Sequence, residues 1–405
     1  MSDARSNNGP WLTIIGIGED GPAGLTAESR AALAAAEIVM GAERHLTLIP
    51  ETKAETVVWP VPFKDGLSLL DGYRGRPTVV LASGDPFWFG AGSILAGRYD
   101  REEWRAFPAI STFQLAASRM GWPLEKTTCL GLHAAPLSQL RARLAPKARM
   151  ILLLRDGEAV GTLANWLVET GFGDSDVTVM EALGGPRERL RSRKAQSYDL
   201  NDVAHPVCVA LDCKGAGSVM PRSAGLTDDW FDHDGQITKR PVRALTLSAL
   251  APRPFEHLWD IGAGSGSIGI EWLMRDATLT ATAFESNMSR AARATENSKK
   301  FGLGGRIHVV EGKAIDHLDD QTIPDAVFIG GGLDEALLQK LWGLLPTGTR
   351  LVANAVTLES EALLANWQAD KGGELLRIEL AEAAPLGRKR GWKSAYPIVQ
   401  WSVTL

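Results

Sequence analysis

The chain has few cysteines, no long apolar run and little net charge. Its 405 residues include three cysteines, Cys129, Cys208 and Cys213, and no pair of them has the spacing of a metal site. This small odd number predicts reduced thiols, no bound metal and a cytoplasmic location. No apolar stretch could span a bilayer, and the polar residues 1–10 lack the apolar segment of a signal peptide, so no membrane partner is expected. A net charge of −5 does not favour non-specific binding of nucleic acid.

The stretch Leu258–Glu271 organises the second half of the chain. Its apolar start predicts a strand that ends near Ile261, and the residues from Ser267 onward predict a helix. Glycines without a Cβ allow a tight turn between them and the close approach of a ligand. The glycines of this turn are Gly262, Gly264 and Gly266, with Ala263 and Ser265 between them. The pattern predicts the binding of a nucleotide-like cofactor.

Neighbouring residues bear on the identity of that cofactor. Glu285 ends the next predicted strand about 20 residues on, where an acid can accept hydrogen bonds from ribose hydroxyls. Ala314 lies at the turn after a third strand, where an adenine could rest. Asp260 favours S-adenosylmethionine over a nicotinamide dinucleotide, because a carboxylate there can meet an amino group but would repel a pyrophosphate. The alternative is that Asp260 only caps the turn.

Strands and helices alternate along both halves, which predicts an α/β protein of two or three domains. The first half begins with a strand at 11–15, a glycine turn and a helix over 27–39. No Gly-Lys-Ser/Thr follows this turn, which excludes a P-loop. A passage rich in Gly, Ser and Pro predicts domains at 1–212 and 229–405, joined by a linker at 213–228.

Several motifs of the first half come in a characteristic order. They are the Gly16-Ile-Gly18 turn with Leu25-Thr26, the loop Ser83-Gly84-Asp85-Pro86, and Glu181-x-x-Gly184 with Glu188. In this order they resemble the two-lobed tetrapyrrole methylases, closest to the CbiE-type precorrin methylases of cobalamin biosynthesis. The resemblance implies a class III methyltransferase fold in which five residues shape the cofactor cleft: Gly84, Asp85, Pro86, Ser111 and Thr112. It also implies that the first glycine turn faces the tetrapyrrole.

The second half resembles the CbiT-type methyltransferases, which have the Rossmann-like class I fold. The segment Gly235-x-Ile237-Thr238-Lys239-x-x-x-Arg243 carries this resemblance, and it implies that Thr238 lies near the cofactor. The predicted strand 324–329 ends in Gly330-Gly331-Gly332 and lacks the Asp/Asn-Pro-Pro-Tyr clamp of amino-group methyltransferases that act on nucleic acids. The bare glycines leave room for a bulky substrate, and a later strand brings Asn354 to the same rim.

Both resemblances together imply S-adenosylmethionine-dependent methylation of a precorrin at meso carbons 5 and 15, with decarboxylation of the ring C acetate. The second half would carry out the decarboxylation with one methylation, and the first half the other methylation. Two alternatives stay open, namely a nicotinamide-dependent oxidoreductase and a methyltransferase in which one half is a non-catalytic scaffold. The resemblance to the second family also implies a homo-oligomer, possibly a tetramer.

Substrate carboxylates would suit basic side chains, because Arg forks pair with carboxylates through two hydrogen bonds. The candidates are Arg240, Arg243, Arg388, Arg390 and Lys393. The last three lie in a basic loop, which could equally be a solvated hairpin tip. No residue is singled out as a general base; the possible ones are Asp232, His233, His257 and Glu271.

Overall fold

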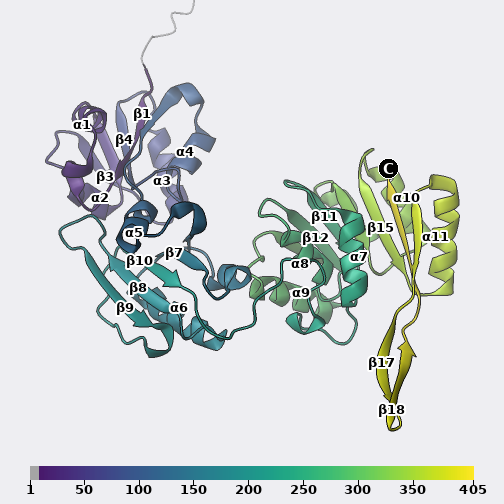
Figure 1. Cartoon of the computed structure of the whole chain (residues 1–405). Coiled ribbons are helices and arrows are strands. Elements are labelled where there is room, and N and C mark those ends of the chain that lie inside the picture. The colour runs from purple at the N-terminus through teal and green to yellow at the C-terminus, as the bar shows by residue number, and fades with distance from the viewer. Residues whose placement is uncertain (1–8) are drawn as a thin grey trace, which may run out of the picture. The chain divides into compact units, whose positions relative to one another are not determined.

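The computed structural model describes residues 9–405, which form two compact units (Figure 1). The first unit takes the chain up to Ala135 and then Leu144–Ser218; the second takes Pro136–Arg143 and Val219–Leu405. The prediction that residues 1–10 form no signal peptide falls mostly outside the described residues, because the structure describes none of residues 1–8. The predicted linker at 213–228 contains the division at Val219, and the domain limits themselves stay a prediction. Within residues 9–405, no helix is long and apolar enough to cross a membrane.

The first sheet of the first unit is wholly parallel, in the order β3-β2-β4-β1-β5. All six residues of β1 are buried, as expected for a strand that has helices on both faces of its sheet. The strands are β1 (Leu12–Ile17), β2 (Ile38–Gly41), β3 (Glu55–Val58), β4 (Thr78–Ser83) and β5 (Trp104–Phe107), and the helices are α1 (Ala27–Ala34), α2 (Glu43–Leu48), α3 (Phe63–Asp71) and α4 (Gly92–Arg98). The helix predicted over 27–39 is therefore too long, because its last residues belong to β2.

The second sheet of the first unit is mixed, in the order β6-β7-β10-β8-β9, with only β6 and β7 parallel. Its strands are β6 (Thr128–Gly131), β7 (Arg149–Leu154), β8 (Asp176–Glu181), β9 (Arg189–Lys194) and β10 (Val207–Asp212), with α5 (Thr112–Met120) and α6 (Gly157–Glu169). Helix α5 begins at Thr112, because Ser111 and Gln114 form a capping box there. Its buried Phe113 and Ala117 pack against β7 and β10.

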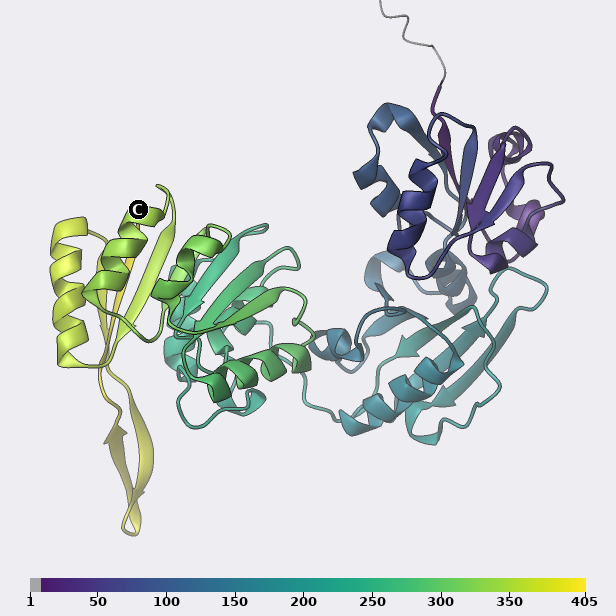
Figure 2. The same cartoon turned by 180° about the vertical axis from the view of Figure 1, so that it is seen from behind.

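The second unit contains a seven-stranded sheet in the order β13-β12-β11-β14-β15-β19-β16 (Figure 2). The first five strands are parallel, and β19 and β16 are antiparallel to their neighbours. The strands are β11 (His257–Ile261), β12 (Thr280–Glu285), β13 (Ile307–Glu311), β14 (Ala326–Ile329), β15 (Arg350–Ala355), β16 (Glu374–Ile378) and β19 (Ile398–Thr404), and the helices are α7 (Arg240–Leu250), α8 (Ser267–Leu273), α9 (Met288–Lys300), α10 (Glu335–Leu344) and α11 (Leu358–Lys371).

Apolar clusters cover both faces of this sheet. Leu247 of α7 and Ile270 of α8 belong to one cluster, whereas Leu338 of α10 and Leu364 of α11 belong to the other. This three-layer arrangement confirms the α/β class that the sequence predicts.

A two-stranded ribbon, β17 (Ala381–Leu386) and β18 (Lys389–Ser394), projects from the second unit beyond its large sheet (Figure 1). Its strands pair with each other and with no other strand among the described residues. The basic loop of the sequence is thus the tip and second strand of this ribbon.

Candidate active sites

A cavity of about 810 Å³ lies at the carboxyl ends of the parallel strands in the second unit. Strand β11 has β12 on one side and β14 on the other, so the strand order reverses there, which is where open α/β sheets bind ligands. The cavity is lined by residues that end or follow five strands: Ile261, Glu285, Gly312, Gly330 and Asn354. The sheet topology alone thus brings distant parts of the sequence to one site.

The glycine turn after β11 forms one wall of this cavity. Gly262, Gly264 and Gly266 have φ angles of +70°, +58° and +76°, which glycine adopts without strain. A Cβ on Gly262 would lie 2.5 Å from the backbone nitrogen of Gly331, so this turn packs directly on the loop after β14. A side chain at position 262 would therefore collide with the loop after β14.

Glu285 holds the glycine turn in place from the end of β12. Its Oε2 accepts a hydrogen bond from the backbone N–H of Gly264 at 2.8 Å, and its Oε1 accepts one from Asn287 at 2.8 Å. Each carboxylate oxygen has two lone pairs, so each can accept one further hydrogen bond. Glu285 lines the cavity and can therefore receive hydroxyl groups of a ligand.

Asp260 lies beneath the turn, is fully buried and does not line the cavity. Its Oδ2 accepts from the backbone N–H of Gly269 at 2.9 Å, while its Oδ1 has no partner among the described residues. Burial, with a smaller contribution from the charge of Glu285, raises the pKa of Asp260 to about 7. The structure corrects the expectation of direct contact with a cofactor, because a carboxyl with no exposed surface cannot meet a ligand in this conformation. Asp260 has the capping role instead.

Asn354 is fixed at the opposite rim by two buried side chains. Its Nδ2 donates to Thr246 Oγ1 at 3.0 Å, and Gln400 donates to Asn354 Oδ1 at 2.9 Å and to Thr246 Oγ1 at 3.1 Å. The Asn354 amide has a second N–H that this network does not use. The network joins α7, β15 and β19 and sets the orientation of this polar group beside Gly330–Gly332.

A second cavity, of about 750 Å³, lies in the first unit. It is lined by the ends of β1, β2 and β4 from the first sheet, and by parts of β7, β8 and β10 from the second. Gly84 has a φ of +53°, and a Cβ on Gly16 would overlap its carbonyl oxygen. These glycines therefore let β1 and the loop after β4 meet at the cavity floor.

Charged and polar side chains gather on one side of this second cavity. The carboxylate of Glu19 forms ion pairs with Arg44 and, at 2.9 Å, with Arg187. Arg44 Nη2 lies 2.8 Å from Ser83 Oγ and 2.9 Å from His45 Nε2, and these two atoms are 2.9 Å apart. Burial raises the pKa of the nearby Cys208 thiol to about 12, so this thiol stays protonated and is no nucleophile.

Two family models match the chain, and together they cover nearly all of it. The first, described as Tetrapyrrole (Corrin/Porphyrin) Methylases, matches residues 11–198, and the second, described as Precorrin methyltransferase domain, matches residues 229–405. A precorrin-6Y C(5,15)-methyltransferase [decarboxylating] of a Sinorhizobium species is 48% identical over 400 residues, or 98% of this chain and 96% of that protein. The chain belongs to this family.

Other members and solved structures are similar too. A protein of the same name from Mycobacterium tuberculosis is 39% identical over 97% of this chain and 99% of that protein. The crystal structure of the C-terminal domain of precorrin-6Y C5,15-methyltransferase from Rhodobacter capsulatus is 50% identical, with a TM-score of 0.45, and covers 46% of this chain and 100% of that chain. The family consists of methyltransferases, so the chain is an enzyme of this class.

Most residues predicted to bind a cofactor lie on the two cavities. In the second unit the cavity is lined by Thr238, Gly262, Ala263, Gly264, Ser265, Glu285 and Ala314, and in the first unit by Gly84, Asp85, Ser111 and Thr112. Gly266 and Pro86 do not line a cavity: Gly266 precedes α8, and the carbonyl of Pro86 accepts from Gly92 at 2.9 Å. Ser265 lines the cavity, although its Oγ is buried and has no hydrogen-bond partner in the described chain. Whether these residues hold a cofactor stays a prediction.

The residues predicted to bind substrate carboxylates are placed differently. Arg243 is fully buried and donates to Glu271 at 2.7 Å, to Asp228 at 3.1 Å and to the carbonyl oxygens of Leu226 and Thr238. The structure corrects the expectation for Arg243, because its guanidinium is used entirely within the protein core. Arg240 does not line the cavity, and neither do the three candidates on the ribbon, Arg388, Arg390 and Lys393. Their part in substrate binding stays a prediction.

The four possible bases of the second unit do not line its cavity either. Glu271 is fully buried and bound to Arg243, and His257 lies within hydrogen-bond distance of Thr280 and Thr282 on the neighbouring strand. His233 accepts from the N–H of Gly235 at 3.0 Å. The structure therefore gives none of them a place beside a ligand.

Some cavity residues were missed in the sequence. Lys239, Arg290 and Lys313 are the cations that line the second unit's cavity, and none of them was given a role in the site. Lys239 belongs to the recognised motif and Lys313 precedes Ala314, whereas Arg290 lies five residues beyond Glu285. In the first unit, His45 and His205 line the cavity from separate elements. No known motif contains both histidines. The one signal in the sequence is that His45 follows a strand that ends at Gly41 and His205 precedes a strand that begins at Val207.

Proposed function

We propose that the chain transfers two methyl groups from S-adenosylmethionine to meso carbons 5 and 15 of precorrin-6Y and removes the ring C acetate carboxyl group as carbon dioxide. The product would be precorrin-8, in cobalamin biosynthesis, and the reaction would take place in the cytoplasm. The observation that carries the proposal is the presence of one cavity at the carboxyl ends of parallel strands in each unit of a chain that belongs to the family. Membership of this family decides against a nicotinamide-dependent oxidoreductase.

The second unit's cavity suits S-adenosylmethionine. The free lone pairs of Glu285 can accept hydrogen bonds from both ribose hydroxyls, and the backbone at Ala314 can border the adenine. Residues 262–265 of the glycine turn border the same cavity, so the methionine part of the molecule would lie against their backbone. When bound, the cofactor supplies a methyl group that is electrophilic because it is carried by a sulfonium.

The first unit's cavity offers a second cofactor site formed by Gly84, Asp85, Ser111 and Thr112. The same cavity carries exposed aromatic side chains, Trp88 and Phe89, that can lie against a flat macrocycle. In each unit the protein has to align the methyl group with an electron-rich carbon and exclude water. No metal is needed for either transfer.

Counting cofactor sites tests the proposal. Isothermal titration of the whole chain with S-adenosylmethionine should give two sites, and Glu285→Ala should give one. Glu311→Ala is the matched control, since Glu311 pairs with Glu285 in register on β13 but does not line the cavity. A single site in the unmodified chain would contradict the proposal and favour a scaffold role for one unit.

Mass spectrometry tests the reaction itself. The whole chain, with S-adenosylmethionine and metal-free precorrin-6Y, should yield a product with two added methyl groups and one carbon dioxide less. Two cofactor sites without any mass change of the precorrin would overturn the substrate assignment and leave the methyltransferase class intact.

We also propose that copies of the chain associate through the second unit. The supporting observation is the projecting ribbon, whose Leu386 and Trp392 side chains are 70% and 79% exposed. Apolar groups that stand this far into solvent are typical of surfaces that bind another protein.

A further inference from the structure

The two methyl transfers of the proposed function differ in their proton balance, and this inference rests on that function. When a carbon that bears hydrogen takes a methyl group from a sulfonium, a C–C bond forms, the S–C bond breaks and one proton must leave the substrate. When the transfer is coupled to loss of carbon dioxide from an acetate side chain, the electron pair of the broken C–CO₂ bond neutralises the transferred charge. The proton that leaves the methylated carbon is then balanced by one that the side-chain carbon takes up as it becomes a methyl group. The first reaction therefore releases a net proton and needs an acceptor for it, whereas the second releases none.

Histidines are divided between the two cavities in the same way. Three line the cavity of the first unit, His45, His133 and His205, and none of the described residues that line the second unit's cavity is a histidine. Imidazole is the side chain best suited to accept a proton near neutral pH. Because the histidines line the cavity of the first unit, we assign the methyl transfer that releases a proton to that unit.

The other basic groups of the first cavity are already engaged. Nε2 of His45 accepts from Arg44, a group that can only donate, so its lone pair is used. Burial and the Arg44 charge lower the pKa of His45 to about 4. Glu19 is held in two ion pairs. Asp85 Oδ1 accepts from the N–H of Phe87 at 2.8 Å, and a carboxylate is in any case a weaker base than a neutral imidazole. These contacts leave His205 and His133 as free imidazoles.

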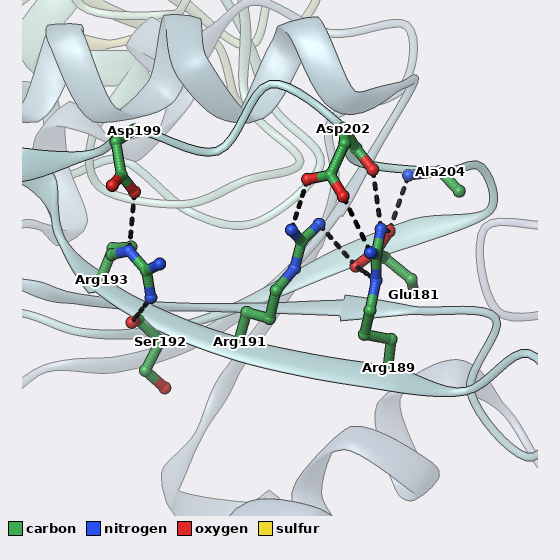
Figure 3. Close-up of polar contacts among 8 residues, drawn as sticks. All are labelled: Glu181, Arg189, Arg191, Ser192, Arg193, Asp199, Asp202 and Ala204. Atoms are coloured by element: carbon green, nitrogen blue, oxygen red, sulfur yellow. Dashed lines mark hydrogen bonds and ion pairs between the residues drawn. The ribbon is translucent and has the colours of Figure 1, made fainter.

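His205 differs from His133 in that it directly follows Ala204, which belongs with Asp202 to the charge network drawn in Figure 3. The preceding residue, Ala204, donates its N–H to Glu181 Oε1 at 2.7 Å. The carboxylate of Asp202 bridges Arg189, at 2.9 Å, and Arg191, and both arginines also bind Glu181. Because Glu181 is almost wholly buried, the network anchors the segment 202–204 to β8 and β9 and fixes where His205 enters the cavity.

We propose that His205 is the catalytic base of the first unit, and that Asp202 is a positioning residue that holds it. Its ring nitrogens have no hydrogen-bond partner among the described residues, so a lone pair is available to the substrate proton. Desolvation and the nearby charges of Arg44 and Arg187 lower the pKa of His205, against the opposing effect of Glu19 and Asp156, which keeps the imidazole neutral near pH 7. The proton passes from the methylated carbon to His205 and then to solvent, because the side chain is partly exposed.

The test uses the whole chain with S-adenosylmethionine and metal-free precorrin-6Y, and follows the two methyl additions by mass spectrometry. His205→Ala should slow the addition that is not coupled to loss of carbon dioxide by about 100-fold or more, while the decarboxylating addition keeps its rate. Imidazole in the buffer should restore part of the lost rate. His308→Ala, at an exposed histidine that lines neither cavity, is the control and should neither lose this rate nor respond to imidazole. Loss and imidazole rescue in His133→Ala, with His205→Ala unaffected, would overturn the assignment to His205.

The positioning role has a separate readout. Asp202→Ala should lower the same rate less than His205→Ala does, without rescue by imidazole, because the base is present but displaced. Calorimetry should still find two cofactor sites in both variants. A His205→Ala chain that adds both methyl groups within about twofold of the parent rate overturns the inference. If the parent chain itself leaves the precorrin unchanged, the proposed function fails instead.

Discussion

Asp260 shows how burial alone changes the behaviour of one carboxyl group. Its fellow acid Glu285, one strand away, accepts two backbone N–H groups and faces the cavity, whereas Asp260 has one such partner and no solvent. The sequence places both acids correctly at strand ends but cannot tell which of them lies under the turn. Their different surroundings follow from the packing of α8 over β11.

Replacement of Asp260 by Asn should change the pH dependence of stability. The pKa of this group is about 7 in the folded chain and near 3.8 in the unfolded chain, so the folded state binds more protons between these values. The free energy of unfolding of the parent therefore falls as pH rises from about 4 to about 7, by at most about 4 kcal/mol. The free energy of unfolding of Asp260→Asn should not fall in this way, because the amide does not titrate. Its side-chain oxygen can still accept a hydrogen bond from the N–H of Gly269.

Urea unfolding of both proteins across this pH range measures the effect. The stability of Asp260→Asn relative to the parent should grow as pH rises, while the exposed Glu311→Gln control should follow the parent. Parallel curves for Asp260→Asn and the parent would show that the carboxyl does not bind its proton more tightly in the folded state.

At the scale of elements, the network of Thr246, Asn354 and Gln400 ties a helix to two strands at the cavity rim. Thr246→Val removes the acceptor of two amide N–H groups and leaves them buried without a partner. We expect a loss of about 1–3 kcal/mol in the free energy of unfolding. Chemical denaturation measures it, with the exposed Ser248→Ala on the same helix as control. An equal loss in both variants would contradict a specific role of the network.

The sequence predicted the elements whose signals are local. The glycine turn after β11 and the buried apolar strands each depend on neighbours a few residues away, so they could be recognised without a structure. The helix predicted over 27–39 failed at its end, because an alanine-rich helix and the apolar strand Ile38–Gly41 follow each other without a glycine or proline between them.

Contacts across long sequence separations could not be predicted. In the sequence, Arg243 cannot be distinguished from an arginine that binds substrate. The ion pairs of Arg243 with Glu271 and Asp228 form only once the chain has folded. The same holds for His45 on α2 and His205 in the loop before β10, which line one cavity although they are 160 positions apart in the sequence. Charge alone does not tell whether a side chain faces a ligand or the core.

At the scale of the whole molecule, we expect copies of the chain to associate through the projecting ribbon. Replacement of Leu386 and Trp392 by Ser should shift the chain from its multimer to smaller species, because the apolar contact area is lost. Size-exclusion chromatography with light scattering measures this shift. Leu358→Ser, at an exposed apolar position on α11, is the control and should leave the multimer intact. A monomeric parent, or a double variant with the parent's mass, would contradict association through the ribbon.

The ribbon is also the most basic segment of the second unit. Arg388, Lys389, Arg390 and Lys393 lie within six residues of one another on a ribbon with two free edges. Copies that meet ribbon to ribbon bring like charges within the roughly 8–10 Å over which charges still act at physiological ionic strength. Added salt screens this repulsion and strengthens the apolar contact, so the assembly should tighten as ionic strength rises, whereas an interface built on ion pairs would loosen.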